Sequence, residues 1–259
     1  MANRSFVRGE RLEHVRFGVT YQNEDAFTLT WEHGELIRYE DGGAKAVLAP
    51  DAHRSFATRD LVRWGAPLAL ARCGHVLLHA ATASKYGSRV AFVGRGGAGK
   101  STLVRDLQGH GWKQLTDDVL AVNKDARAAP TAEAELRAWC NEVTPKVQTT
   151  GAIPYQELVR RLNAKLKDAW GRLDALTFLT LPRSSDHRFS LTPLTGHAVF
   201  QALVEEGFGG SPHPQAWKHQ FLVYGALTSN MRAYVARAPE GIEPMREALD
   251  DLDALASAQ

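Results

Sequence analysis

Hydrophobic and polar positions alternate over short distances in the first fifty residues of the chain. Between residues 5 and about 50, short stretches rich in aromatic and β-branched residues are separated by Asn, Asp and Gly residues that are typical of turns. The clearest of these stretches are residues 17–22, 26–32 and 35–40. This pattern predicts a small antiparallel sheet.

The apolar spacing changes to three and four residues from about Ser55 to Cys73, which predicts a helix there. The change of period divides the chain into a small β-rich N-terminal region, residues 1–54, and a larger domain, residues 55–259. A chain of 259 residues is long enough for one large domain with an appendage of this kind.

Strands and helices alternate in the middle of the chain. Residues 75–87 predict a strand that ends in a turn, and residues 88–94 predict an apolar strand that ends in glycine. Residues 101–111 follow with helical spacing and close on a Gly-His-Gly turn, and residues 113–122 predict a further strand. This order is typical of an α/β domain.

The second half of the chain continues the alternation. The predicted elements are a helix over residues 155–170, strands over 175–182 and 189–194, a helix over 195–206 and a last helix over 243–258. The Gly- and Pro-rich stretch 207–214 has the composition of a mobile loop over a substrate, or of a plain connector.

Composition narrows the partners and the compartment. Lys and Arg (31) nearly balance Asp and Glu (29), so the net charge of +2 predicts no nucleic-acid and no membrane partner. The start of the chain lacks the apolar region of a secretory signal, and no window approaches the roughly 18 apolar residues that span a bilayer. Two cysteines without CxxC spacing fit reduced thiols. We therefore expect a soluble cytoplasmic protein.

A phosphate-binding loop is the strongest motif in the chain. The run from Gly94 to Ser101 matches GxxxxGK[ST], between an apolar strand and an amphipathic helix. Glycines let backbone N–H groups turn inward and form an anion-binding nest at the start of the helix. We expect ATP to be bound there with Mg²⁺ by Gly94, Gly96, Gly97, Ala98, Gly99, Lys100, Ser101 and Thr102. Lys100 would reach the β- and γ-phosphates, and Ser101 would place its hydroxyl on Mg²⁺.

Two adjacent carboxylates follow the loop closely. Asp117 and Asp118 lie in the middle of the predicted strand 113–122, seventeen positions after Lys100. Consecutive residues of a strand point to opposite faces, so the two aspartates should have different roles. One would accept the proton of an attacking hydroxyl, and the other would help to order Mg²⁺. A solvated Asp-Asp turn is the alternative interpretation.

His79 precedes the loop, inside an apolar stretch. A histidine in this setting is more often a hydrogen-bonded core residue than a catalytic one. The residues themselves leave both interpretations open.

Residues 77–123 resemble the core of the HPr kinase/phosphorylase family. The shared order is a Leu-His pair, a short hairpin ending in Gly, a loop with GKS, a helix, a glycine turn and a strand with Asp-Asp. The resemblance implies a P-loop kinase core of the HPr kinase/phosphoenolpyruvate carboxykinase type, and phosphorylation of a protein serine with ATP and Mg²⁺. It also implies that Asp117 is the general base, supported by Asp118 and His79.

The chain departs from the bifunctional members of that family. Their phosphorylase signature, Ile-Arg-Gly-Leu-Gly, is absent from the region after the Asp pair. The chain looks more like the stand-alone serine kinases of the superfamily, such as the kinases of lasso-peptide precursors. This resemblance implies a peptide or protein acceptor that carries a serine, and it allows a homo-oligomer.

Two other functions fit the same residues. Metabolite kinases also place an aspartate on the strand after the loop helix, so a small-molecule acceptor stays open. A binding module gated by nucleotide would keep the loop without catalysing transfer. The Asp pair argues against such a module, because a switch needs no base directed at a hydroxyl.

Overall fold

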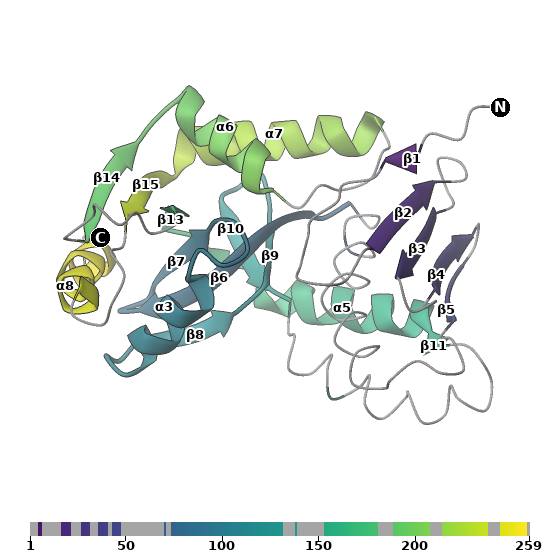
Figure 1. The fold of residues 1–259 in the computed structure, drawn as a ribbon, viewed down its shortest axis with the longest axis horizontal. Helices are drawn as coiled ribbons and strands as arrows, with labels where there is room; N and C mark the ends of the chain where they lie inside the picture. Colours follow the sequence, from purple (N-terminus) through teal and green to yellow (C-terminus); the bar gives the residue numbers. More distant parts are fainter. Residues whose placement is uncertain are drawn as a thin grey trace.

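The protein has a mixed α/β fold with its strands in two sheets. The computed structural model describes residues 5–6, 17–21, 27–31, 36–40, 43–47, 70, 74–131, 138, 153–180, 189–207, 214–237 and 244–257. Within these residues, the strands form a sheet of six and a sheet of nine. Figure 1 shows the N-terminal strands of the smaller sheet, in purple, beside the larger sheet and its helices. In this part of the chain, no helix combines the length and apolar character needed to cross a bilayer.

The smaller sheet is antiparallel throughout its described strands. Its order is β1 (Ser5–Phe6), β2 (Phe17–Tyr21), β3 (Phe27–Trp31), β4 (Leu36–Glu40), β5 (Gly43–Val47) and β11 (Ile153–Pro154). The predicted N-terminal antiparallel sheet is therefore confirmed. β11 comes from much later in the chain and pairs with β5. The division at residue 54 stays a prediction.

The larger sheet carries the glycine-rich loop. Its strands are β6 (Val76–Lys85), β7 (Ser88–Val93), β8 (Lys113–Thr116), β9 (Val119–Val122), β10 (Arg127–Pro130), β12 (Gly171–Arg172), β13 (Ala175–Thr180), β14 (Ser190–Leu194) and β15 (Arg232–Arg237). The order across it is β12-β10-β9-β6-β7-β13-β15-β14, and β8 also pairs with β6. β7, β13 and β15 run parallel, whereas the remaining pairs in this sheet are antiparallel.

Helices cover both faces of the larger sheet. They are α3 (Lys100–Gln108), α5 (Tyr155–Ala169), α6 (His197–Glu206), α7 (Pro214–Asn230) and α8 (Pro244–Ser257). Side chains of β7 alternate between the faces, as the strand period requires. Val90 and Phe92 pack in one core with residues of α3 and α8, whereas Ala91 and Val93 pack in a second core with residues of α6 and α7.

Most of the predicted elements in the second half of the chain are confirmed. The helices over residues 155–170, 195–206 and 243–258 correspond to α5, α6 and α8 within a few residues. The helix predicted around residues 55–73 lies outside the described residues except at Leu70, and so does the interior of the stretch 207–214. α7 and β15 were not predicted, and both belong to the larger sheet and its covering layer.

Candidate functional site

The glycine-rich loop, residues 94–99, connects the end of β7 to the start of α3. Gly97 and Gly99 have φ angles of +82° and +87°, which L-residues with a Cβ rarely adopt. Gly94 is required for a different reason, since a Cβ there would lie 2.7 Å from the backbone oxygen of Leu179 at the end of β13. The strand, loop and helix expected around the motif are all present.

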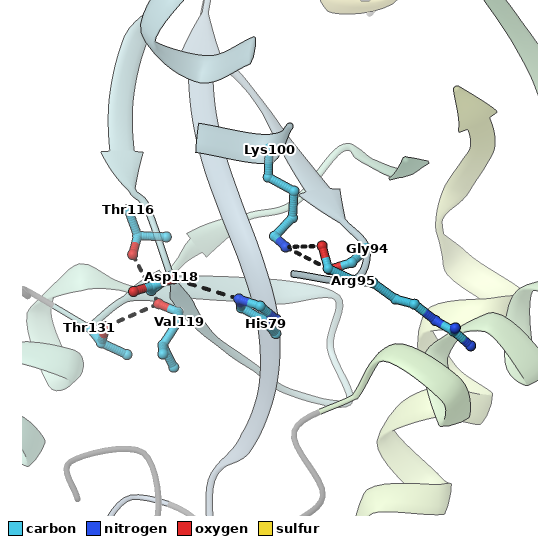
Figure 2. Close-up of polar contacts among 8 residues, drawn as sticks. All are labelled: His79, Gly94, Arg95, Lys100, Thr116, Asp118, Val119 and Thr131. Carbon is cyan, nitrogen blue, oxygen red and sulfur yellow. Dashed lines mark hydrogen bonds and ion pairs between the residues drawn. The ribbon is translucent and has the colours of Figure 1, made fainter. Parts of the chain in front are cut away.

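Lys100 begins α3 and turns back over the loop. Its side chain is buried, and its Nζ donates hydrogen bonds to the carbonyl oxygens of Gly94 (2.6 Å) and Arg95 (3.1 Å). Figure 2 shows the ammonium directed at these two oxygens. A buried cation needs such partners, because desolvation without them is costly. Ser101 and Thr102 follow in the first turn of the helix and are exposed.

The two aspartates lie in a bend, which corrects the single strand expected over residues 113–122. The bend separates β8 from β9, and both strands pair with β6. At its centre the N–H of Ala80 donates to the carbonyl of Asp118 (3.1 Å), and Ala80 is paired with Val93 on its other edge. At about 4.8 Å per strand, the backbone of the bend lies about 10 Å from the end of β7.

His79 approaches Asp118 from β6. Its Nε2 lies 3.6 Å from Oδ1 of Asp118, and both side chains are partly exposed (Figure 2). Its neighbours Leu78 and Ala80 pack in the core with α6 and α7. The strand period therefore directs His79 to the opposite face, on which α3 lies. This separation of the two side chains exceeds a direct hydrogen bond, so the contact is electrostatic when the ring is protonated.

Asp117 carries a buried oxygen that no described group satisfies. The residue is half-buried, and its Oδ1 has no hydrogen-bond partner among the residues that the structure describes. Buried carboxylate oxygens are normally matched by a donor or a cation, because leaving them unmatched is costly. The atom therefore has capacity for a ligand hydroxyl, a water molecule or a metal-bound water.

The end of α6 reaches the loop from the other side of the sheet. Nε of Arg95, which is largely exposed, lies 3.7 Å from Oε1 of Glu206 in the last turn of the helix. The next residue, Gly207, forms an isolated β-bridge with Leu78, the neighbour of His79. Glu206 was not predicted as a site residue, because its contact with the loop depends on how α6 crosses the sheet.

The residues near the loop could hold Mg²⁺ only together with phosphate oxygens and water molecules. In the described part of the chain, no three His, Cys, Asp or Glu side chains cluster in a way that could hold a metal ion. Mg²⁺ at nucleotide sites takes one or two protein oxygens and completes its octahedron with phosphates and water. Ser101 in the first turn of α3 and the Asp118 carboxylate are oxygen donors of the required kind.

Some of the predicted site residues are in direct contact, whereas others lie on neighbouring strands of the same sheet. His79 and Asp118 are in contact, and Lys100 contacts the loop that it follows. The loop and the bend face each other across β6 through Ala80. Beyond the predicted set, two buried threonines, Thr116 and Thr131, donate to the backbone beside the bend (Figure 2).

Comparison with known proteins gives distant structural likeness but no match in sequence. No protein-family model and no curated protein matches the chain. Among solved structures, the HPr(Ser) kinase/phosphatase from Coxiella burnetii matches over 70% of this chain and 92% of its own, with 14% sequence identity and a TM-score of 0.29. A likeness at that level does not place the chain in a family.

Proposed function

We propose that the protein transfers the γ-phosphate of ATP to a hydroxyl group, with Mg²⁺ and with Asp117 as general base. The observation that carries the proposal is the buried Oδ1 of Asp117, which no described group satisfies, across β6 from the end of the strand that leads into the loop. A base must accept a hydrogen bond from the hydroxyl that it deprotonates, and this oxygen has that capacity.

Different groups of the chain have different roles in an in-line transfer of the phosphoryl group. Asp117 accepts the hydroxyl proton while the hydroxyl oxygen forms a bond to the γ-phosphorus. The bond from that phosphorus to the β,γ-bridging oxygen breaks, and ADP leaves with the electron pair. Lys100 and the inward N–H groups of the loop hold the phosphate oxygens on which negative charge spreads.

Ser101, Asp118 and His79 support this centre. Ser101 and Asp118 would hold Mg²⁺, which supplies charge neutralisation at the β- and γ-phosphates when bound. His79 lies beside Asp118 and orients its carboxylate. β13, the parallel neighbour of β7, contains no Asp or Glu, so the metal-directed carboxylate comes from the bend.

The acceptor that we propose is a serine of a peptide or protein. The support for it is the resemblance of residues 77–123 to HPr kinase-like enzymes, stated above. A small-molecule hydroxyl would meet the same base, so the two acceptors have to be separated by experiment. Incubation with γ-labelled ATP and either a serine peptide library or a metabolite pool would show which one receives the label.

Paired substitutions test the assignment of the base. Asp117→Asn keeps the shape of the side chain but cannot accept the proton, so we expect turnover to fall by about 10²–10⁴-fold with near-normal ATP affinity. Lys100→Ala, as the matched variant, should weaken both ATP binding and turnover. Loss of ATP binding in Asp117→Asn would refute the assignment. Nucleotide-dependent capture of a partner without phosphorylated product would favour a binding module.

A further inference from the structure

The carbonyl of Val119, the first residue after the Asp pair, accepts hydrogen bonds from two threonines. Oγ1 of Thr116 and Oγ1 of Thr131 each donate to it at 3.0 Å. Figure 2 shows both hydroxyls converging on this oxygen, next to the contact between Asp118 and His79. All three of these residues, the two threonines and the valine, are buried.

The two hydroxyls hold the bend from different sides. Thr116 is the last residue of β8, so its bond to Val119 closes the two-residue bend that contains the aspartates. Thr131 directly follows β10, so its bond ties the bend to the next strand of the sheet. The carbonyl of Asp118 is held in turn by the N–H of Ala80. The peptide groups that follow Asp118 and Val119 are thus anchored on β6, on β8 and on the residue that follows β10.

An apolar residue would suit these buried positions better if packing were the sole requirement. Valine has the shape of threonine and carries no polar group that must be matched when buried. Both hydroxyls are matched by the same carbonyl, and hydrogen bonds in such surroundings are strong and directional. Their common effect is to fix the backbone that presents the two carboxylates.

We propose that Thr131 and Thr116 are positioning residues, which hold the bend so that Asp117 and Asp118 keep their catalytic geometry. This inference rests on the proposed function. A displacement of about 1 Å in a catalytic group can lower the rate by about a hundredfold. Loss of either hydroxyl should therefore act on turnover more than on ATP binding, because the loop lies on the other side of β6.

The test compares Thr131→Val with Thr131→Ser and with a matched control. Thr177→Val is that control, because Thr177 is fully buried on β13 and its hydroxyl has no hydrogen-bond partner among the described residues. We expect Thr131→Val to lower kcat by about ten- to a hundredfold with the KM for ATP within about twofold. Thr131→Ser should restore kcat, and Thr177→Val should leave it unchanged. Unchanged kcat in Thr131→Val, or failure of serine to rescue it, would overturn the inference.

A readout without turnover separates this inference from the proposed function. The NMR signal of the His79 ring, assigned with His79→Gln, reports the position of the Asp118 carboxylate beside it. It should move in Thr131→Val and return in Thr131→Ser. If the wild-type protein transfers no phosphate to any acceptor, the proposed function fails and the His79 signal alone decides the positioning role. An unmoved signal would overturn that role.

Discussion

Replacement of Gly94 by alanine tests the loop geometry without any assumption about activity. The Cβ of an alanine there would lie 2.7 Å from the backbone oxygen of Leu179 and 3.4 Å from the Cβ of Ala98. The first of these contacts is closer than carbon and oxygen tolerate, and the oxygen belongs to the backbone of β13. Relief therefore requires the loop to move away from the strand that runs parallel to β7.

The expected cost follows from the kind of strain at each glycine. Overpacking of a well-packed site costs about 1–3 kcal/mol, which for a domain of this size lowers Tm by about 2–12 °C. Gly97→Ala meets no atom within 4 Å but keeps a φ of +82°, so its cost is that of the left-handed region, about 1–2 kcal/mol. Gly96→Ala meets neither obstacle and should be neutral or slightly stabilising.

Thermal unfolding without nucleotide measures the stability of each variant directly. Bound nucleotide would shift each Tm by an amount that depends on the affinity of that variant for it. We expect Gly94→Ala to have the lowest Tm of the alanine variants and Gly96→Ala to match the wild type. Gly96→Ala is the matched control, since it places the same methyl group in the same loop. Equal Tm values for Gly94→Ala and Gly96→Ala would refute the close approach of the loop to β13.

Two further predictions concern contacts away from the aspartates. The hydrogen bond from Lys85 to Asp253 (2.5 Å) raises the pKa of Lys85, so its stabilisation is complete below about pH 10.5 and is lost as the pH rises through the raised value. Asp253→Asn should remove this part of the pH dependence of the free energy of unfolding above about pH 10, and an unchanged pH dependence there would contradict it. Gly207→Ala would overlap the hydroxyl of buried Tyr224 and lie 2.6 Å from the carbonyl of Leu203, which should cost about 1–3 kcal/mol. Tyr224→Phe in that background should recover part of the lost Tm, and no recovery would show that the strain lies elsewhere.

The elements that the sequence predicts well are those whose pattern is strictly local. α5 has apolar residues at helical spacing, and buried Leu162 and Leu166 lie on its inner face. The apolar strand β7 and the glycine-rich loop are equally recognisable, because a strand, a Gly-rich turn and a helix follow each other without a gap.

The sequence indicates the bend at the Asp pair only as the alternative to a continuous strand. Residues 113–122 carry apolar residues on both sides of the aspartates and look like one strand. β6 pairs with both β8 and β9, at Thr82 and at His79, and its register with β8 shifts between Thr82 and Ala83, next to the bend. Pairing with a neighbouring strand determines where a strand is interrupted, and local residue propensity does not predict it.

The contacts between the site and distant segments of the chain could not be predicted from the sequence either. α7 was missed because its apolar side chains do not gather on one face, and it packs on the sheet chiefly through Val223, Tyr224 and Leu227. The approach of Glu206 to Arg95 depends on that layer, since α6 and α7 cover the same face. Such contacts follow from topology, which a single sequence specifies only weakly.

The pairing of Ala80 has a consequence for how this site can change. The single strand β6 separates the end of β7 from the bend that carries the carboxylates: Ala80 is paired with Val93 on one edge, and its N–H donates to the carbonyl of Asp118 on the other. Strands held on both edges are the last parts of a domain to open. The sheet therefore sets the separation between the glycine-rich loop and the Asp pair before any ligand binds. A change of acceptor in the proposed reaction would therefore leave this strand untouched and vary the surrounding segments.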